Sequence, residues 1–243
     1  MSTKLSAVPR LLPSAALSPA LLGEAGGPGR TSASTAQTYV LGNAGRCAER
    51  PTLLTLLSDN SGSMYGGNDP VGNRYTEAAY ACQQVARRCR CGKCAVSILH
   101  FDTPTSCDVD PTPLRTGMKP ITAGLAVPSD GAGISSLTPS LRAAGKIAAD
   151  HADHHKVLIV FSDFELFDSN LLGLYADLGA YPGQVHAVVM RSTPPAALTV
   201  HPDITVTQVG PADPQGAVAR ALFDSLTTHR PGRRLAGQKR HRS

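Results

Sequence analysis

Three short segments of the sequence are almost entirely apolar, and each is followed within two residues by an aspartate. The segments and their aspartates are residues 53–57 with Asp59, residues 94–101 with Asp102, and residues 157–161 with Asp163. Strands buried on both faces of a parallel sheet carry such runs, because helices cover both sides of the sheet. Two further apolar runs, at 185–190 and 204–209, extend the series. The sequence therefore predicts a buried, mostly parallel sheet.

Segments with helical periodicity lie between these runs. Helices are expected at about 74–88, from Thr138, at about 170–178, and after Asp213. Two of the starts carry a favoured cap residue followed by proline, namely Thr138-Pro139 and Asp213-Pro214. Residues 103–133 are rich in proline and glycine, so irregular loop with at most a short strand near Ile121 is expected. The alternation predicts an α/β fold with a doubly wound, mostly parallel central sheet flanked by helices.

The chemistry is expected where the parallel strands end, because ligands of such sheets bind at the carboxyl ends of the strands. Asp59 and Asp163 both lie at this edge. The loop after Asp59 adds the hydroxyls of Ser61 and Ser63, with Gly62 between them. All these donors are hard oxygens, which suit Mg²⁺, Mn²⁺ or Ca²⁺ and disfavour zinc or copper.

The segment Asp59-Asn60-Ser61-Gly62-Ser63 resembles the Asp-x-Ser-x-Ser signature of the von Willebrand factor type A (VWA) family, which carries a metal-ion-dependent adhesion site. Residues 133–141 and 161–165 are similar to the second and third metal loops of that family. The resemblance implies that Ser61, Ser63 and a second-loop hydroxyl bind the metal directly, while Asp59 and Asp163 act largely through water. It also implies that an acidic residue of a partner completes the coordination.

Two positions depart from the family pattern. The second loop usually supplies a threonine, and Ser135 stands at the equivalent position here; Thr138 is the other candidate, although its place before Pro139 favours a role as helix cap. Phe164 follows Asp163 where the family often has glycine, so the backbone of the third loop has less freedom. We expect the metal ligands to be Asp59, Ser61, Ser63, Ser135 and Asp163.

The resemblance implies a cytoplasmic, divalent-metal-dependent protein-binding domain, an adaptor or recruiter that docks an acidic residue of a protein partner. Family members of this kind often work beside AAA-type ATPases, and secretion is the minor alternative. A metal-dependent hydrolase or phosphatase with Asp59 as nucleophile is the other reading. It is disfavoured because Ser61 stands where phosphoryl-transferring aspartates have a second aspartate, and because nucleophile-elbow and P-loop motifs are lacking. The chain is therefore not expected to be an enzyme.

The six cysteines suggest a second site. Cys89, Cys91 and Cys94 are closely spaced, and Cys91-x-x-Cys94 resembles half of a zinc knuckle that Cys107 or Cys47 would complete. A zinc or redox cluster of Cys89, Cys91, Cys94 and Cys107 is thus one interpretation, and a disulfide or free thiols are the others. Cys82 and Cys89 also lie on the apolar stripe of a predicted helix, where core packing is the simpler explanation.

Histidines and chain ends carry weaker signals. His151 and His155 are one helical turn apart and would suit a metal, although polar residues are common where helices end. Residues 1–45 are expected to be a flexible leader, 46–229 the VWA-like domain, and 230–243 a disordered tail with six Lys/Arg and no acid. Because the net charge of +5 comes from these ends, nucleic-acid binding is not expected. No run approaches the roughly 20 apolar residues of a membrane span.

Overall fold

The computed structural model describes residues 39–65, 67 and 69–237, and it contains the predicted sheet. Six strands are arranged in the order β4-β3-β2-β5-β6-β7. Their bounds are β2 Thr52–Ser58, β3 Ala95–His100, β4 Val109–Pro113, β5 His155–Ser162, β6 Gln184–Met190 and β7 Ile204–Val209. All neighbours pair in parallel except β3 with β4. The expected α/β class with a mostly parallel central sheet is confirmed.

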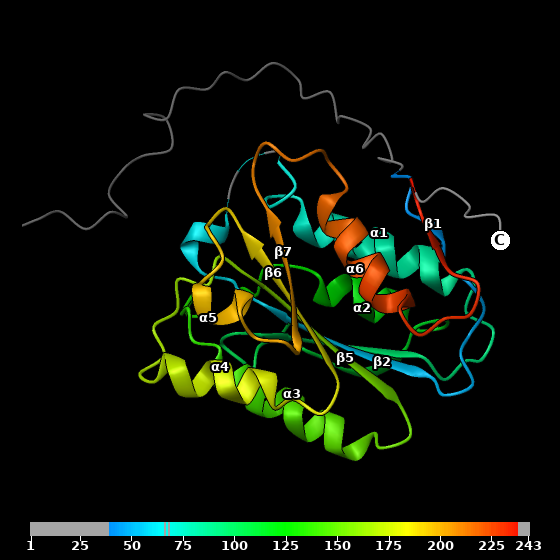
Figure 1. The fold of residues 1–243 in the computed structure, drawn as a ribbon, viewed down its shortest axis with the longest axis horizontal. Helices are drawn as coiled ribbons and strands as arrows, with labels where there is room; N and C mark the ends of the chain where they lie inside the picture. The colour runs from blue at the N-terminus through cyan, green and yellow to red at the C-terminus, as the bar shows by residue number, and fades with distance from the viewer. Residues whose placement is uncertain (1–38, 66, 68, 238–243) are drawn as a thin grey trace, which may run out of the picture. The chain divides into compact units, whose positions relative to one another are not determined.

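Helices cover both faces of this sheet (Figure 1). One face carries α1 Arg74–Ala86, α2 Met118–Gly124 and α6 Ala217–Thr227, and the other carries α3 Thr138–Asp150 and α4 Leu171–Gly179. Two short helices, η3 Gly62–Met64 and α5 Ala196–Thr199, lie in connections. Among the described residues no helix is both long and apolar enough to cross a membrane.

The two faces explain why the strands are apolar along their whole length. Alternate residues of a strand point to opposite sides of the sheet. In β5, Ile159 and Phe161 join the core beneath α1 and α6, whereas Leu158 and Val160 join the core beneath α3 and α4. Successive residues of the strand are therefore buried alternately against one layer of helices and the other.

The segment 103–133 is more regular than predicted. It contains β4 and α2, and Ile121 is a buried residue of α2 instead of a strand residue. β4 includes Pro111 and Pro113, and a strand was not predicted here because proline lacks the N–H group that pairs strands. The position of β4 at the edge of the sheet tolerates them, because an edge strand needs only part of its N–H groups for pairing.

The domain also extends beyond its predicted bounds. β1 Gly42–Asn43 pairs in antiparallel orientation with β8 Arg234–Leu235. Arg230 is buried, and its guanidinium donates to the carbonyl oxygens of Ala44 at 2.8 Å and Gly45 at 3.3 Å. Residues 39–45 and 230–237 therefore belong to the folded domain, contrary to the expected leader and tail. The remainder of those two predicted segments, 1–38 and 238–243, lies outside the described residues.

Two predicted helix caps are wrong. In each case the carboxylate of a distant residue binds N–H groups at the start of the helix, in place of the predicted neighbouring side chain. Thr138 is the first residue of α3, and its N–H donates to Asp168. Asp213 accepts from Gly210 N–H, while the start of α6 is capped by Glu77 of α1, which accepts from the N–H groups of Gly216, Val218 and Ala219 at 2.7, 2.9 and 3.1 Å. A buried carboxylate satisfies N–H groups that would otherwise lack partners.

Candidate metal centre

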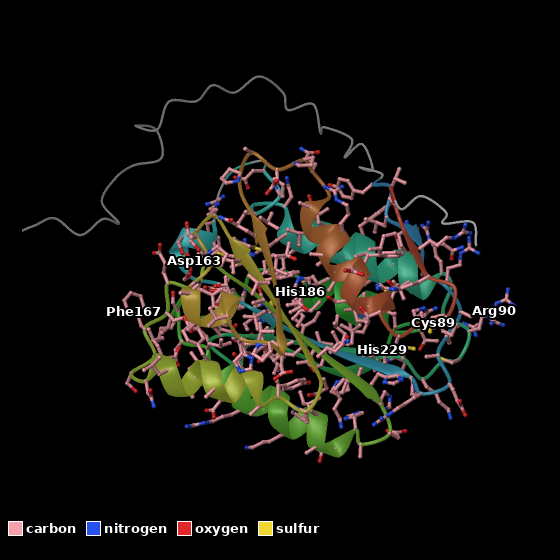
Figure 2. The ribbon with its side chains drawn as sticks, in the orientation of Figure 1. Cys89, Arg90, Asp163, Phe167, His186 and His229 are labelled. Atoms are coloured by element: carbon pink, nitrogen blue, oxygen red, sulfur yellow. The ribbon has the colours of Figure 1, made fainter. Side chains whose placement is uncertain are left out.

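The centre of the sheet positions two of the predicted metal ligands. β2 and β5 are adjacent, and the chain leaves β2 toward β3 on one side while β5 continues toward β6 on the other. Asp59 and Asp163 directly follow these two strands, and Asp59 N–H donates to Phe161 O at 2.8 Å. Such a point of reversal is where ligands of α/β sheets bind. Figure 2 shows Asp163 at this end of the sheet, together with Phe167.

Hydrogen bonds link the first loop to the third. Asp59 Oδ1 accepts from Ser61 N–H at 2.8 Å, and its Oδ2 accepts from Ser162 Oγ at 2.7 Å. The hydroxyls of Ser61 and Ser63 lie 3.1 Å apart, and Ser63 donates to Asp163. Four of the five predicted ligands, Asp59, Ser61, Ser63 and Asp163, thus lie in one hydrogen-bonded group with Ser162.

The second loop, which carries Ser135, is attached to the third. Phe167 N–H donates to Ser135 O at 2.8 Å. The carboxylate of Asp168 accepts from Ser136 Oγ at 3.0 Å, Leu137 N–H at 2.8 Å and Thr138 N–H at 3.0 Å. Burial alone would raise the pKa of Asp168, but these hydrogen bonds prevail and lower it. Thr138 is the first residue of α3, and Ser135 is a buried residue of the loop before that helix; the role of Ser135 as a metal ligand stays a prediction.

Asp102, at the end of β3, attaches the second loop to the first. It accepts from Asn60 Nδ2 at 2.7 Å, Gly133 N–H at 2.7 Å and Ile134 N–H at 3.1 Å. The loops approach so closely that a Cβ on Gly131 would lie 2.6 Å from Asn60 Nδ2. Asp102 was not predicted as a site residue, although its position after an apolar run was the available signal. The three loops are thereby joined pairwise into a closed set.

Comparison with solved structures identifies this architecture. The chain is similar to a von Willebrand factor type A protein from Catenulispora acidiphila, with 11% identity, a TM-score of 0.54, and coverage of 78% of this chain and 49% of that one. The pilus adhesin SpaC from Lactobacillus rhamnosus GG gives 13% identity, a TM-score of 0.56, and coverage of 76% and 31%. The SpRpn10 VWA domain gives 11% identity, a TM-score of 0.50, and coverage of 72% and 94%.

The chain has the VWA fold. The likeness is one of fold, and the chain spans about half the length of the Catenulispora acidiphila protein (49%) while covering 94% of the SpRpn10 VWA domain. No protein-family model matches the sequence, and neither does any curated protein.

Two arginines stabilise the first loop of the VWA fold by donating hydrogen bonds to its carbonyl oxygens. Arg74, the first residue of α1, is buried and donates to the carbonyl oxygens of Met64, Val71 and Asp59. Arg191, which follows β6, donates to Ser63 O at 3.1 Å and Tyr65 O at 3.0 Å. Sequence reasoning missed both residues, because carbonyl contacts across many residues leave no local pattern.

The third loop shows how the chain accommodates Phe164 where the family often has glycine. Phe164 has a φ of 58°, in the left-handed region that glycine adopts most easily. For a non-glycine residue this conformation costs about 1–2 kcal/mol. Its ring is buried in the core, and its N–H donates to Ser162 Oγ at 2.8 Å. Burial of an aromatic side chain contributes about 2 kcal/mol and offsets the strain.

The electrostatics of the site suit a cation. Burial raises the pKa of Asp59; hydrogen bonds from Ser162 and Ser61 oppose the shift, and the nearby charge of Asp163 adds to it. Two buried carboxylates and several hydroxyls in one group form a hard, anionic donor set, which fits Mg²⁺, Mn²⁺ or Ca²⁺. A bound divalent ion would neutralise the repulsion between the two carboxylates.

The cysteines form a different group from the one predicted. Cys89, Cys91 and Cys94 lie with Cys47, all four sulfur atoms being within 4.8 Å of one another, and Cys107 is not a member. Cys47, which comes from the segment before β2, is the alternative fourth member that the sequence left open. Cys82 lies in the core, as its place on the apolar stripe predicted, and burial raises its pKa to about 12.

His151 and His155, which one helical turn would bring together, lie apart from each other's rings. His155 stacks on His229 with ring centroids 4.1 Å apart, while His151 packs edge-on against His154 at 5.3 Å. The two residues therefore have different neighbours, because the strand β5 begins at His155 and ends the helical spacing. His100 and His186 are buried strand residues.

Proposed function

We propose that this chain is a protein-binding domain that docks an acidic residue of a partner through a bound divalent cation, Mg²⁺ or, alternatively, Mn²⁺ or Ca²⁺. The observation that carries the proposal is the closed set of three loops, in which Ser63 bonds Asp163 while Asp102 and Asp168 fix the second loop. Ser61, Ser63 and Ser135 would hold the ion directly, with Asp59 and Asp163 beside it. The ion supplies a positive centre to which a carboxylate binds.

Exposed apolar side chains around these loops support docking of a protein. Tyr65, Ile134 and Phe167 are 43%, 51% and 82% exposed. Each belongs to a different loop of the site: Tyr65 lies two residues after Ser63, Ile134 immediately precedes Ser135, and Phe167 follows Asp163 by four residues. Aromatic and apolar residues around a charged contact are typical of the energetically dominant part of a protein interface. The partner segment is therefore expected to carry an acidic residue flanked by apolar ones.

The geometry argues against the alternative, in which Asp59 is the nucleophile of a hydrolase or phosphatase. Asp59 is fully buried, and both of its carboxylate oxygens accept hydrogen bonds from Ser61 and Ser162. A nucleophile needs an oxygen that can reach the substrate. Asp59 is better suited to shaping the first loop, so we propose a binding domain and not an enzyme.

The cellular setting rests on the family resemblance. We propose a cytoplasmic adaptor or recruiter, for which a component of an AAA-type ATPase system is a candidate partner. Of the proteins with this fold, SpaC is a pilus adhesin. The proposal for this chain concerns the same type of activity, with a different partner.

The test is capture of partners from an extract by the immobilised chain, with Mg²⁺ or with EDTA. The wild type and Asp177→Asn, which changes an exposed acid of α4, should retain the same partner in Mg²⁺ and release it in EDTA. Asp59→Ala should capture none of it. Identical capture by wild type and Asp59→Ala would refute metal-dependent docking.

A second pair of variants tests the apolar rim. Phe167→Ser should weaken capture without changing thermal stability, because the side chain is 82% exposed. Val40→Ser removes an equally exposed apolar side chain, 76% exposed, from the segment before β1, and should have no effect. An equal loss of partner capture in both variants would mean that exposed apolar side chains contribute to capture wherever they lie, and that the loops of the site are not a specific docking surface.

A further inference from the structure

Four cysteines from two distant parts of the chain meet at the amino ends of the strands. Cys47 precedes β2, Cys89 and Cys91 follow α1, and Cys94 directly precedes β3. The Sγ–Sγ distances are 3.7 Å for Cys47–Cys89, 3.7 Å for Cys89–Cys91 and 3.5 Å for Cys91–Cys94. Figure 2 shows Cys89 and Arg90 at the end of the domain opposite Asp163 and Phe167.

These distances match the edges of a tetrahedron around a single metal ion. With Zn–S bonds of about 2.3 Å, a tetrahedral site has sulfur atoms about 3.8 Å apart. A disulfide would require about 2.05 Å, and all six cysteines are free. Four sulfur atoms within 4.8 Å of one another also leave no room between them for a multinuclear iron–sulfur cluster. Soft thiolate ligands in a tetrahedral arrangement select zinc over Mg²⁺ or Ca²⁺.

The backbone around the four sulfur atoms is shaped for such a site. Gly92 adopts a φ of +69°, a conformation that allows the tight turn between Cys91 and Cys94. Arg90 N–H points at Cys47 Sγ, at 3.3 Å. Hydrogen bonds from main-chain groups to ligand atoms orient the ligands of metal sites.

Positive charge surrounds the cysteines. Four thiolates with Zn²⁺ carry a net charge of −2. A cavity of about 630 Å³ next to Cys47 is lined by Arg46, Arg87, Arg88 and Arg90. These cations would balance the charge of the zinc–thiolate centre.

We propose that Cys47, Cys89, Cys91 and Cys94 bind one Zn²⁺ as a closed structural site that fastens the segment before β2 to the start of β3. Four protein ligands leave no position for water or substrate, so the ion has a structural role. The fastened segment also contacts the C-terminal segment of the domain, because Arg46 N–H donates to Pro231 O at 2.9 Å. The zinc site is independent of the proposed docking site.

Elemental analysis of protein purified without a metal-affinity step tests the composition. Wild type and the control Cys107→Ser, which changes a cysteine outside the group, should carry about one zinc per chain. Cys47→Ser and Cys94→Ser should retain less than about a tenth of that amount. Cobalt substitution of the wild type should give the intense visible bands of tetrahedral thiolate-bound Co²⁺. Iron in place of zinc, a disulfide among these four cysteines, or full zinc content in Cys94→Ser would overturn the proposal.

A second measurement avoids dependence on variants that fail to fold. Zinc is released from the wild type with a thiol reagent, and hydrogen exchange is compared before and after release. Residues 43–47 should exchange at least about tenfold faster after release, because the cysteine cluster anchors them. The loops that carry Ser63 and Asp163 should keep their exchange rates. Unchanged exchange in residues 43–47 would refute the structural role of the ion.

Discussion

Ser63 donates a hydrogen bond to the carboxylate of Asp163, although 100 residues separate them in the chain. The contact joins the loop after β2 to the loop after β5, which are neighbours at the centre of the sheet. It brings a hydroxyl and a carboxylate, both hard oxygen donors, to the same point. A divalent cation at this point would be held directly by Ser63, with the carboxylate of Asp163 beside it.

Removal of the Ser63 hydroxyl should therefore weaken metal binding directly. In Ser63→Ala we expect Mg²⁺ affinity, measured by isothermal titration calorimetry, to fall about tenfold or more. Glu165→Gln is the matched control, since Glu165 is an exposed acid only two residues from Asp163, and it should bind Mg²⁺ like the wild type. Equal affinities of Ser63→Ala and wild type would contradict the proposed ligand set.

The second-loop ligand can be identified by comparing two hydroxyl deletions. Ser135→Ala should lower Mg²⁺ affinity and leave stability nearly unchanged. Thr138→Ala should leave both Mg²⁺ affinity and stability nearly unchanged, because the N–H of residue 138, which bonds Asp168 at the start of α3, is retained in the variant. The reverse pattern of affinities in calorimetry, with urea unfolding unchanged in both variants, would assign the ligand role to Thr138.

Glu77 should be a major determinant of stability although it lies outside the site. Its buried carboxylate accepts from three N–H groups at the start of α6. In Glu77→Ala these groups lose their partner, and we expect the free energy of unfolding to fall by about 3 kcal/mol. Glu77→Gln retains one acceptor oxygen and should cost less. The exposed control Glu49→Gln should match the wild type in urea unfolding.

Asp108 should make stability sensitive to acid. Burial by itself would raise the pKa of this carboxyl, but hydrogen bonds from His100, Thr103 and Thr105 prevail and hold it at about 2. Since the folded pKa lies below the unfolded value of about 3.9, the stabilisation is complete above about pH 5 and is lost as the pH falls through 4 toward 2. Its size is about 2 kcal/mol.

Acid unfolding of a variant isolates this contribution. Asp108→Asn should be less stable than the wild type at neutral pH and should lose less stability between pH 4 and pH 2. The exposed Asp110→Asn should follow the wild-type curve. Parallel curves for wild type and Asp108→Asn would show that other carboxyls govern acid unfolding.

The predictable part of this protein is the part encoded locally. Continuous apolar runs that end at Asp59 and Asp163 predicted both strands and the edge at which their loops meet, because burial on two faces leaves a direct mark on the sequence. The position of Ser61 and Ser63 at this edge was predictable because they lie within four residues of Asp59, and their role as metal ligands stays a prediction. The structure places these residues together.

The unpredicted part depends on contacts between distant segments. Asp102 binds the loop at 133–134, Asp168 caps α3, and Glu77 caps α6, each across 30 or more positions. Local reasoning selected Thr138 and Asp213 instead, because a nearby cap residue is the usual solution. Cys47 joined the cysteine group in place of Cys107 for the same reason, since the fold of the backbone decided which sulfur atom came close.

The pairing of β1 with β8 has a consequence for how this domain can be built into larger molecules. Ala236 N–H donates to Leu41 O at 3.0 Å, so the polypeptide enters and leaves the domain at a single place. A domain with adjacent ends can be inserted into a surface loop of a host protein, or circularly permuted through a short linker, without stretching either end. The zinc-binding cysteines would then stand at the junction, where they would stiffen the connection to the host.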